Sequence, residues 1–288
     1  MKKIILIDVS SLIYRCFFAL PPLKSSGGEP TGALYGFSSI LLKVFREFLP
    51  DYVAAAHDRP EPTFRKKEFK EYKMQRPAIS SDLVFQLKEI KNLLPLFGVK
   101  SFEFSGFEAD DIIATLVKKF ENCDSQIIIL SGDLDTLQLV KKDEIIAWIP
   151  KKGISNFSIY NEDAVINRYG IKPSQLPDYK GLVGDKSDNI PGVNGVGPKN
   201  ASLIIKDFGD LEEFYTFFPS SNFSKNSMFK KIIENKDKAL MFKRLATLSF
   251  DVPLGSGGLE EIKVGNFNKE NLKQYFQTKG FYSLISRL

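Results

Sequence analysis

Nine acidic residues form five short groups along this chain of 288 residues. Most of them end or closely follow an apolar run, as in KKIILID, DYVAAAHD and SQIIILSGDLD. Carboxylates that a fold brings together repel one another, and hard divalent cations offset that repulsion. The sequence therefore predicts a metal site lined by carboxylates. The nine residues are Asp8, Asp58, Glu108, Asp110, Asp111, Asp133, Asp135, Asp185 and Asp188.

The positions of these acids favour a shared site over unrelated roles. In open parallel sheets, ligand sites form at the carboxyl ends of the strands, where Asp8, Asp58, Asp133 and Asp135 are expected. Glu108 and Asp111 are three residues apart and would share a face of one helix. A single strand-end Asp is often only a turn residue, and acids in a first helical turn often only stabilise the helix dipole. Five groups at coherent positions are harder to explain in that way.

A basic stretch lies between the second and third acidic groups, in the segment RKKEFKEYKMQR at positions 65–76. Phosphates attract its cations, and the interleaved Phe69 and Tyr72 could stack on unpaired bases. The alternative is a solvated helical face on which Glu68 and Glu71 pair with lysines. Its six basic residues are Arg65, Lys66, Lys67, Lys70, Lys73 and Arg76.

A glycine-rich turn follows the last acidic group, in IPGVNGVGPKNASLII. Gly192, Gly195 and Gly197 permit a tight turn with exposed backbone N–H groups, and Pro198 suits a first helical turn. Backbone amides at a helix N-terminus bind phosphate without reading sequence, and Lys199 could add a cation there. The alternative is an ordinary glycine-rich connection between two helices.

Composition excludes several other chemistries. His57 is the one histidine, so histidine-rich zinc sites and HExxH proteases cannot be built, and no GxSxG accompanies it for a serine triad. Cys16 and Cys123 have no metal-ligand spacing and fit a reducing compartment. The net charge is +5, and without the nine acids the 40 basic residues clearly outnumber the remaining acidic ones. That balance suggests an acidic pocket in a basic surface, suited to a polyanion.

The elements that must position these residues alternate between strands and helices. Apolar runs predict strands at 3–8, 52–57, 127–130 and 145–149, and helical spacing predicts helices at 33–49, 81–97 and 109–120. This alternation predicts an α/β fold with a mostly parallel central sheet flanked by helices. From about residue 160, short helical segments divided by Pro and Gly predict a helical region. No segment approaches the ~20 apolar residues of a membrane helix, and the start does not read as a signal peptide, so we expect a cytoplasmic protein.

Three segments carry a specific resemblance to a known family: GFEADDIIATL, SGDLDTLQLV and GLVGDKSDNIPGVNGVGPKNA. They resemble the 5′ nuclease domain of bacterial family A DNA polymerases, the 5′–3′ exonucleases and the flap endonucleases. The resemblance runs from LIDVSSLIYR to the end of the chain. It implies a PIN-like α/β nuclease core over residues 1–175, with a helical arch near 60–105. It also implies a helical region over 176–288 with a helix–hairpin–helix near 181–208.

The resemblance also implies roles for residues. The nine acids would hold two or more Mg²⁺ or Mn²⁺ ions, for which oxygen ligands are suited. Ions about 4 Å apart can activate a water and stabilise the leaving 3′-oxygen of a phosphodiester. Lys73 and Arg76 match catalytic basic residues near the scissile phosphate. The expected substrate-binding residues are Arg65, Lys66, Lys67, Lys70, Tyr72, Gly192, Gly195, Gly197 and Lys199, with K⁺ at the hairpin.

The resemblance implies an enzyme that removes 5′ flaps and RNA primers from branched DNA during replication and repair, binding DNA without sequence preference and acting as a monomer. A catalytically silent DNA-binding module of the same fold is the alternative, and a compact α/β ribonuclease is a third hypothesis. Two positions depart from the family pattern. Val9 stands where Gly usually follows the first Asp, and His57 stands where Phe usually precedes the second.

Overall fold

A six-stranded sheet forms the centre of the molecule in the computed structural model, which describes residues 1–151, 153–218, 227–265 and 267–288. The strand order is β3-β2-β1-β4-β5-β6, and only β6 runs antiparallel to its neighbour. The expected α/β class with a mostly parallel sheet is thereby confirmed. The strands are β1 (Lys2–Asp8), β2 (Tyr52–His57), β3 (Lys100–Glu103), β4 (Ser125–Leu130), β5 (Ile145–Pro150) and β6 (Phe157–Tyr160).

The strand order reverses between β1 and β4, and such a switch point is where open parallel sheets bind ligands. Each of the two strands is followed by a loop or helix on the same edge. Asp8 ends β1, and Asp133 lies just beyond β4. The topology thus brings two of the acidic groups to one place.

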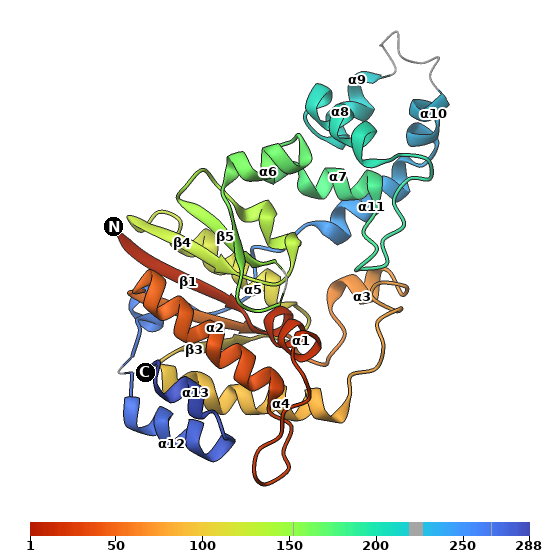
Figure 1. Ribbon diagram of the computed structural model, residues 1–288. Coiled ribbons are helices and arrows are strands. Elements are labelled where there is room, and N and C mark those ends of the chain that lie inside the picture. The colour runs from red at the N-terminus through yellow and green to blue at the C-terminus, as the bar shows by residue number, and fades with distance from the viewer. Residues whose placement is uncertain (152, 219–226, 266) are drawn as a thin grey trace.

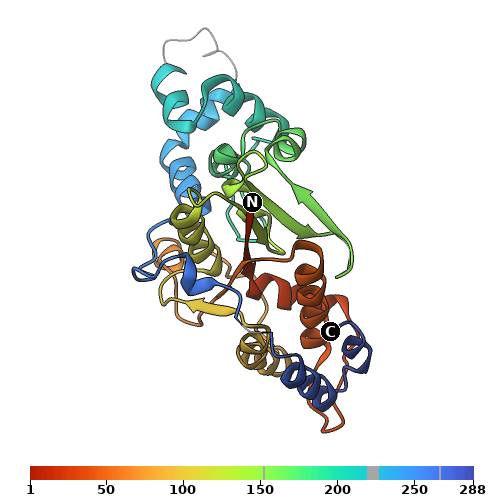
Figure 2. The same ribbon diagram turned by 90° about the vertical axis from the view of Figure 1, so that its left-hand side faces the viewer.

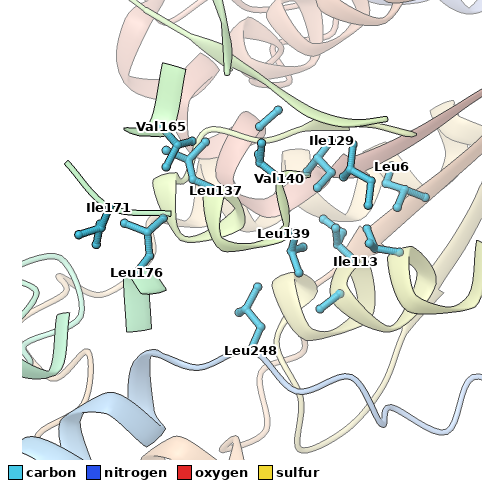
Figure 3. Close-up of a cluster of buried hydrophobic side chains, with 14 of the residues drawn as sticks. Leu6, Ile113, Ile129, Leu137, Leu139, Val140, Val165, Ile171, Leu176 and Leu248 are labelled. Atoms are coloured by element: carbon cyan, nitrogen blue, oxygen red, sulfur yellow. The ribbon is translucent and has the colours of Figure 1, made fainter. Parts of the chain in front are cut away.

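Both faces of the sheet are covered by helices, which explains why its strands are apolar runs without alternation. Ile5 and Ile7 of β1 face a core formed with α1 (Val9–Ala19), α2 (Gly32–Phe48) and α4 (Ser81–Leu93). Ile4 and Leu6 point to the opposite core, where α5 (Ala109–Phe120) packs. Figure 3 shows part of this second core, in which Leu6, Ile113 and Ile129 lie together.

The second half of the chain is helical, as its pattern predicted. Its helices gather at one end of the molecule, and the last two helices pack beside α2 and α4 near the other end (Figures 1 and 2). The short helical elements and remaining helices are η1 (Leu94–Phe97), η2 (Leu134–Leu139), α6 (Glu162–Tyr169), η3 (Pro173–Gln175), α7 (Leu176–Val183), α8 (Pro198–Phe208), α9 (Leu211–Phe217), α10 (Ser227–Glu234), α11 (Lys236–Ala246), η6 (Leu259–Ile262), α12 (Lys269–Lys279) and α13 (Tyr282–Ile285).

The segment expected to form an arch near 60–105 contains several different elements. It starts with the five-residue helix α3 (Phe64–Glu68), continues through turns to residue 76, and runs without helix or strand to α4. Beyond α4 and η1 it enters the sheet as β3. Residues 69–80 therefore form a loop that connects α3 to α4.

Lys279 fastens the C-terminal helix α12 to two segments from the first third of the chain. Its Nζ lies 2.8 Å from Glu29 Oε2, in the loop between α1 and α2, and 2.9 Å from Glu89 Oε2 on α4. The Lys279 side chain is only 9% exposed and also lies over the rings of Phe85 and Tyr275. Charge pairing and ring contacts together stabilise the position of α4.

No helix among the described residues combines the length and apolar character needed to cross a membrane.

Candidate active site

A cavity of about 510 Å³ opens at the carboxyl edge of the sheet. Five of the nine predicted acids line it, and the basic side chains of Lys73 and Arg76 complete its polar wall. The acids come from four separate elements, so the fold and not the local sequence brings them together. The five acids are Asp8, Asp58, Glu108, Asp110 and Asp133.

Asp8 is both the last residue of β1 and the N-cap of α1. Its Oδ1 accepts a hydrogen bond from the backbone N–H of Ser11 at 3.1 Å, and its Oδ2 accepts one from the Ser131 hydroxyl at 2.7 Å. Burial raises the pKa of Asp8, and the nearby Asp58 carboxylate raises it further. Val9 is the first residue of α1 and lies in the core, so it leaves this strand end intact.

Asp58 follows β2 and connects that strand to α5. Its Oδ1 accepts a hydrogen bond from the backbone N–H of Ala109 at 2.8 Å, and its own N–H donates to the Ser10 hydroxyl at 3.1 Å. An acid beside the first turn of a helix is favoured by the helix dipole. This contact holds the start of α5, and with it Glu108 and Asp110, against the end of β2.

Asp110 carries the strongest signal for a cation site. Its Oδ1 is buried and accepts no hydrogen bond within the described part of the chain. Burial raises its pKa well above the usual value, and Asp8, Asp133 and Asp135 raise it further. An unpaired buried carboxylate is costly, so this oxygen fits a site for a divalent cation.

Asp133 adds a further buried carboxylate to the same cavity. It caps the short helix η2, where its Oδ1 accepts the backbone N–H of Asp135 at 3.1 Å. Burial raises its pKa well above the usual value, and the charge of Asp135 adds to the effect. Asp110 and Asp133 therefore both lie in surroundings that disfavour their charged forms unless a cation is near.

Lysine and arginine side chains pair with three of the four predicted acids that do not line the cavity. Lys180 pairs with Asp135 and lies 2.7 Å from Asp185 Oδ2, while Arg76 lies 3.0 Å from Asp188 Oδ1. Within the described ranges, no three acidic, histidine or cysteine side chains already stand in a metal-binding geometry. Direct metal binding by the nine acids therefore stays a prediction.

Asp111 and Arg65 form a buried ion pair, which differs from both expected roles. Arg65 donates two hydrogen bonds of 2.8 Å to the Asp111 carboxylate and others to the carbonyl oxygens of Leu245 and Thr247. The Arg65 side chain is 2% exposed and that of Asp111 is fully buried. Arg65 thus does not reach a substrate here, and Asp111 supports α5 instead of facing the cavity.

Tyr72 is also buried, so it cannot stack on a base in this structure. Its hydroxyl donates to Asp188 Oδ2 at 2.7 Å, and the same hydroxyl oxygen lies 3.1 Å from Glu108 Oε2. Burial and these two carboxylates raise the pKa of Tyr72. The sequence predicted base stacking because Tyr72 stands among basic residues. In the fold its ring packs in a hydrophobic cluster and its hydroxyl is a hydrogen-bond donor.

The remaining basic residues of the stretch divide into two groups. Lys73 Nζ lies 3.1 Å from Glu108 Oε2, and Glu108 and Asp188 raise its pKa although burial opposes this. Lys67 and Lys70 are exposed, and Lys66 donates to backbone carbonyls within the same segment. Only Lys73 and Arg76 line the cavity.

His57 packs inside the molecule, although it precedes Asp58. It is 4% exposed, and its Nε2 lies 3.2 Å from the Ser101 hydroxyl on β3. Burial lowers the pKa of His57 to about 4, so the ring is neutral at physiological pH. It does not line the cavity.

Sequence reasoning did not identify the apolar wall of the cavity or the role of Lys180. Tyr14, Phe17 and Phe18 of α1 line the cavity together with Ile79, and Phe18 is 75% exposed. The one sequence signal for this wall is its place directly after Asp8. Lys180 lies five residues before Asp185, and its spacing alone gave no reason to select it.

The glycine-rich turn lies between two helices, α7 and α8, as predicted. Gly192 and Gly195 have φ values of 71° and 88°, which only glycine adopts readily. Gly197 caps α8, and Lys199 follows in its first turn. None of these four residues lines the acidic cavity, so their expected contact with a duplex remains a prediction.

Comparisons with known proteins agree over the whole length of the chain. Residues 3–170 match the model of the 5′–3′ exonuclease N-terminal resolvase-like domain, and residues 171–270 match the 5′–3′ exonuclease C-terminal SAM fold. The 5′–3′ exonuclease of Aquifex aeolicus is 36% identical over 289 residues, covering all of this chain and 96% of that protein. The DNA polymerase I of Caldicellulosiruptor bescii is 40% identical over 287 residues, and the match spans 33% of its length.

Solved structures share the fold at lower identity. The T5 D15 protein co-crystallised with metal ions aligns with a TM-score of 0.70 at 19% identity, over 85% of this chain and 89% of that chain. The catalytic core of Rad2 in complex with a DNA substrate aligns with a TM-score of 0.62 at 18% identity, over 100% of this chain and 93% of that one. Both matched family models and the Aquifex relative show that the chain belongs to the 5′–3′ exonuclease family.

Proposed function

We propose that this chain is a metal-dependent, structure-specific 5′ nuclease. It hydrolyses phosphodiester bonds near the 5′ end of branched or flapped DNA and leaves 5′-phosphate products. The observation that carries the proposal is the cavity in which buried carboxylates meet Lys73 and Arg76. The family and the DNA in the structure of Rad2 support the same substrate class.

The carboxylates would hold Mg²⁺ or Mn²⁺, with two or more ions in the site. Asp8, Asp110 and Asp133 are the best placed ligands, because each is buried and has a raised pKa. Bound ions would supply the positive charge that activates a water and offsets charge on the leaving oxygen. Metal ions in the structures of T5 D15 support a divalent cation in this fold.

Lys73 and Arg76 would bind the phosphate in the cavity that Asp8 also lines. In the structure both cations pair with carboxylates, through Glu108 and Asp188. A phosphate that enters beside them offers oxygen acceptors of equal charge, so the two cations can turn toward it while they stay close to the acids. Their role is to orient the phosphate and to stabilise charge that develops on it.

The duplex would be held outside the cavity. Gly192, Gly195 and Gly197 expose backbone groups at the start of α8, with Lys199 beside them, and K⁺ could be bound by carbonyls of the same turn. The exposed Lys67 and Lys70, with Lys66, add phosphate contacts near the mouth of the cavity. These contacts read no sequence, so the chain would bind branched DNA without sequence preference. We further propose that it acts as a monomer.

Removal of 5′ flaps and of RNA primers in replication and repair is the role that fits this activity. The chain spans about a third of the length of the polymerase relatives that it matches. The alternative of a silent DNA-binding module would not need the buried, unpaired oxygen of Asp110.

A cleavage assay distinguishes the three hypotheses. A 5′-flap DNA and an unstructured RNA are incubated with the chain, each with Mg²⁺ and with EDTA. The nuclease proposal expects cleavage of the flap one nucleotide into the duplex, lost in EDTA and in Asp110→Asn. Tight DNA binding without cleavage would support the silent module, and preferred cleavage of the RNA would support a ribonuclease.

A further inference from the structure

Two segments that are far apart in sequence are joined beside the cavity by a set of hydrogen bonds. We call residues 71–76 and 186–189 together the clip. The Asn189 side-chain amide donates to the carbonyl oxygen of Glu71 at 2.7 Å, and the Lys73 backbone N–H donates to the carbonyl oxygen of Asp188 at 3.0 Å. The Gln75 amide donates to the carbonyl oxygens of Lys186 at 2.9 Å and Ser187 at 3.1 Å.

The clip holds Lys73 in a backbone conformation that is unfavourable for lysine. Lys73 has φ 53° and Asn189 has φ 59°, both in the left-handed region. Asparagine tolerates that region well, whereas for lysine it is uncommon and must be maintained by surrounding contacts. Asn189 binds the carbonyl oxygen of Glu71, two residues before Lys73. Gln75, two residues after Lys73, binds the opposite segment of the clip. The two contacts therefore support the backbone on both sides of Lys73.

The support on the other side of the clip is rigid. Asp185 and Ile190 exchange two backbone hydrogen bonds, of 2.7 Å and 2.8 Å, and close the loop that carries Asn189. A Cβ at Gly184 would lie 2.4 Å from the carbonyl oxygen of Ile190, and one at Gly192 would lie 2.4 Å from the backbone nitrogen of Gly184. The loop is therefore packed backbone against backbone, and it continues directly into the turn that begins α8.

We propose that Gln75 and Asn189 are positioning residues for the reaction, which act by holding Lys73 in the cavity. Neither side chain lines the cavity, whereas Lys73 does, with its Nζ 3.1 Å from Glu108. The geometry also joins the proposed duplex-binding turn to the phosphate-binding lysine through one short loop. This inference rests on the proposed nuclease function and adds a means by which that site keeps its cation in place.

Charge-neutral substitutions test the proposal. Asn189→Gly retains the left-handed backbone and removes the amide, and Gln75→Ala removes two donors from an exposed side chain. We expect each to lower kcat on a 5′-flap substrate about tenfold, with KM and duplex Kd within about twofold of wild type, because misplacement affects the reacting geometry and not binding. The exposed Gln274→Ala on α12 is the matched control and should leave kcat unchanged.

A double-mutant cycle separates positioning from a general loss of stability. If Asn189 acts through Lys73, then Asn189→Gly in a Lys73→Ala background should cause no further fall in kcat. A merely structural role would lower kcat by the same factor in both backgrounds. That additive outcome, or an equal rise in duplex Kd, would overturn the proposal.

Limited proteolysis gives a measure that does not depend on nuclease activity. Trypsin cleaves after lysine in locally unfolded backbone, and loss of the clip should loosen the backbone around Lys70 and Lys73, so both variants should be cut there several-fold faster than wild type or Gln274→Ala. If wild type cleaves no flap substrate, the proposed function fails while proteolysis still tests the clip. If wild type is active and both variants match it in kcat, the positioning role fails and the nuclease function stands.

Discussion

Lys180 lies between Asp135 and Asp185 and pairs with both, although the two acids belong to separate elements. Its Nζ is 2.7 Å from Asp185 Oδ2. Burial alone would raise the pKa of Asp185, but Lys180 outweighs it and lowers that pKa. A side chain of the protein thus supplies, in this part of the site, positive charge of the kind that a metal ion would bring.

Removing Lys180 should make the response of the protein to divalent metal stronger. In Lys180→Met, Asp135 and Asp185 lose the cation with which a metal must compete, so a metal that binds the folded state stabilises it more. We expect a larger rise in Tm on adding Mg²⁺ than for wild type, measured by thermal denaturation. The exposed Lys206→Met is the control, and an unchanged or smaller rise in Lys180→Met would contradict the expectation.

Asp110→Asn should stabilise the metal-free protein and abolish cleavage. The substitution removes a buried charge that Asp8, Asp133 and Asp135 repel. Without metal we expect the free energy of unfolding to rise by about 1 kcal/mol, as when a strained functional residue is replaced. Urea denaturation in EDTA and a flap-cleavage assay measure the two effects, with the exposed Asp207→Asn as control. A variant that is less stable than wild type, or one that still cleaves the flap, would count against Asp110 as a ligand.

Lys73→Ala should reduce turnover far more than it weakens DNA binding. Lys73 lines the cavity, so its loss removes charge where the phosphate reacts, and a fall in kcat of about 10²-fold is expected. Lys67 is exposed, so Lys67→Ala should mainly weaken binding and reduce its dependence on salt. Flap-cleavage kinetics and duplex binding at several salt concentrations measure both. Equal losses of turnover and binding in Lys73→Ala would point to simple electrostatic attachment.

Arg65→Ala should destabilise the fold strongly. It leaves the fully buried Asp111 carboxylate without its cation, which costs about 3–5 kcal/mol. Arg244→Ala breaks an exposed pair with Glu68 and should cost less than about 1 kcal/mol. Urea denaturation measures both. A loss for Arg65→Ala as small as that of the control would restore Arg65 as a candidate for substrate contact.

The two cysteines should differ in reactivity. Burial raises the pKa of Cys16 to about 12, so almost no thiolate forms there at pH 8, and the side chain is fully covered. In Cys123→Ser, a thiol reagent that forms a coloured product should therefore react only after urea is added. Rapid reaction of the folded variant would show that Cys16 is accessible.

The sequence was sufficient where burial follows directly from an apolar run. KKIILID, YVAAAH and SQIIIL predicted central strands, and their ends placed Asp8, Asp58 and Asp133 at one edge. The edge strands β3 and β6 were missed because their sequences, KSFE and FSIY, are short and only partly buried. Helix α1 was missed because no turn residue separates it from β1, since Asp8 itself serves as the cap.

The sequence was insufficient where a charged or polar group is buried by distant partners. Arg65 and Tyr72 looked like surface groups among lysines, but their partners are Asp111 and Asp188, which lie 46 and 116 residues further along the chain. Burial of a guanidinium depends on carbonyl oxygens at the end of α11, which no local pattern reveals. Spacing can therefore nominate cations for a site, whereas only the fold decides which of them face it.

The contact of Lys279 with Glu29 and Glu89 bears on how a working fragment of this protein should be cut. The matched family models end at residue 270, inside α12. A fragment ended there would lack Phe276, Phe281 and Leu284, which pack against the same core as α2 and α4. It would leave Glu89 without its partner Lys279 and expose apolar surface beneath α4. The final eighteen residues thus stabilise the packing of the α/β core, and expression fragments should retain them.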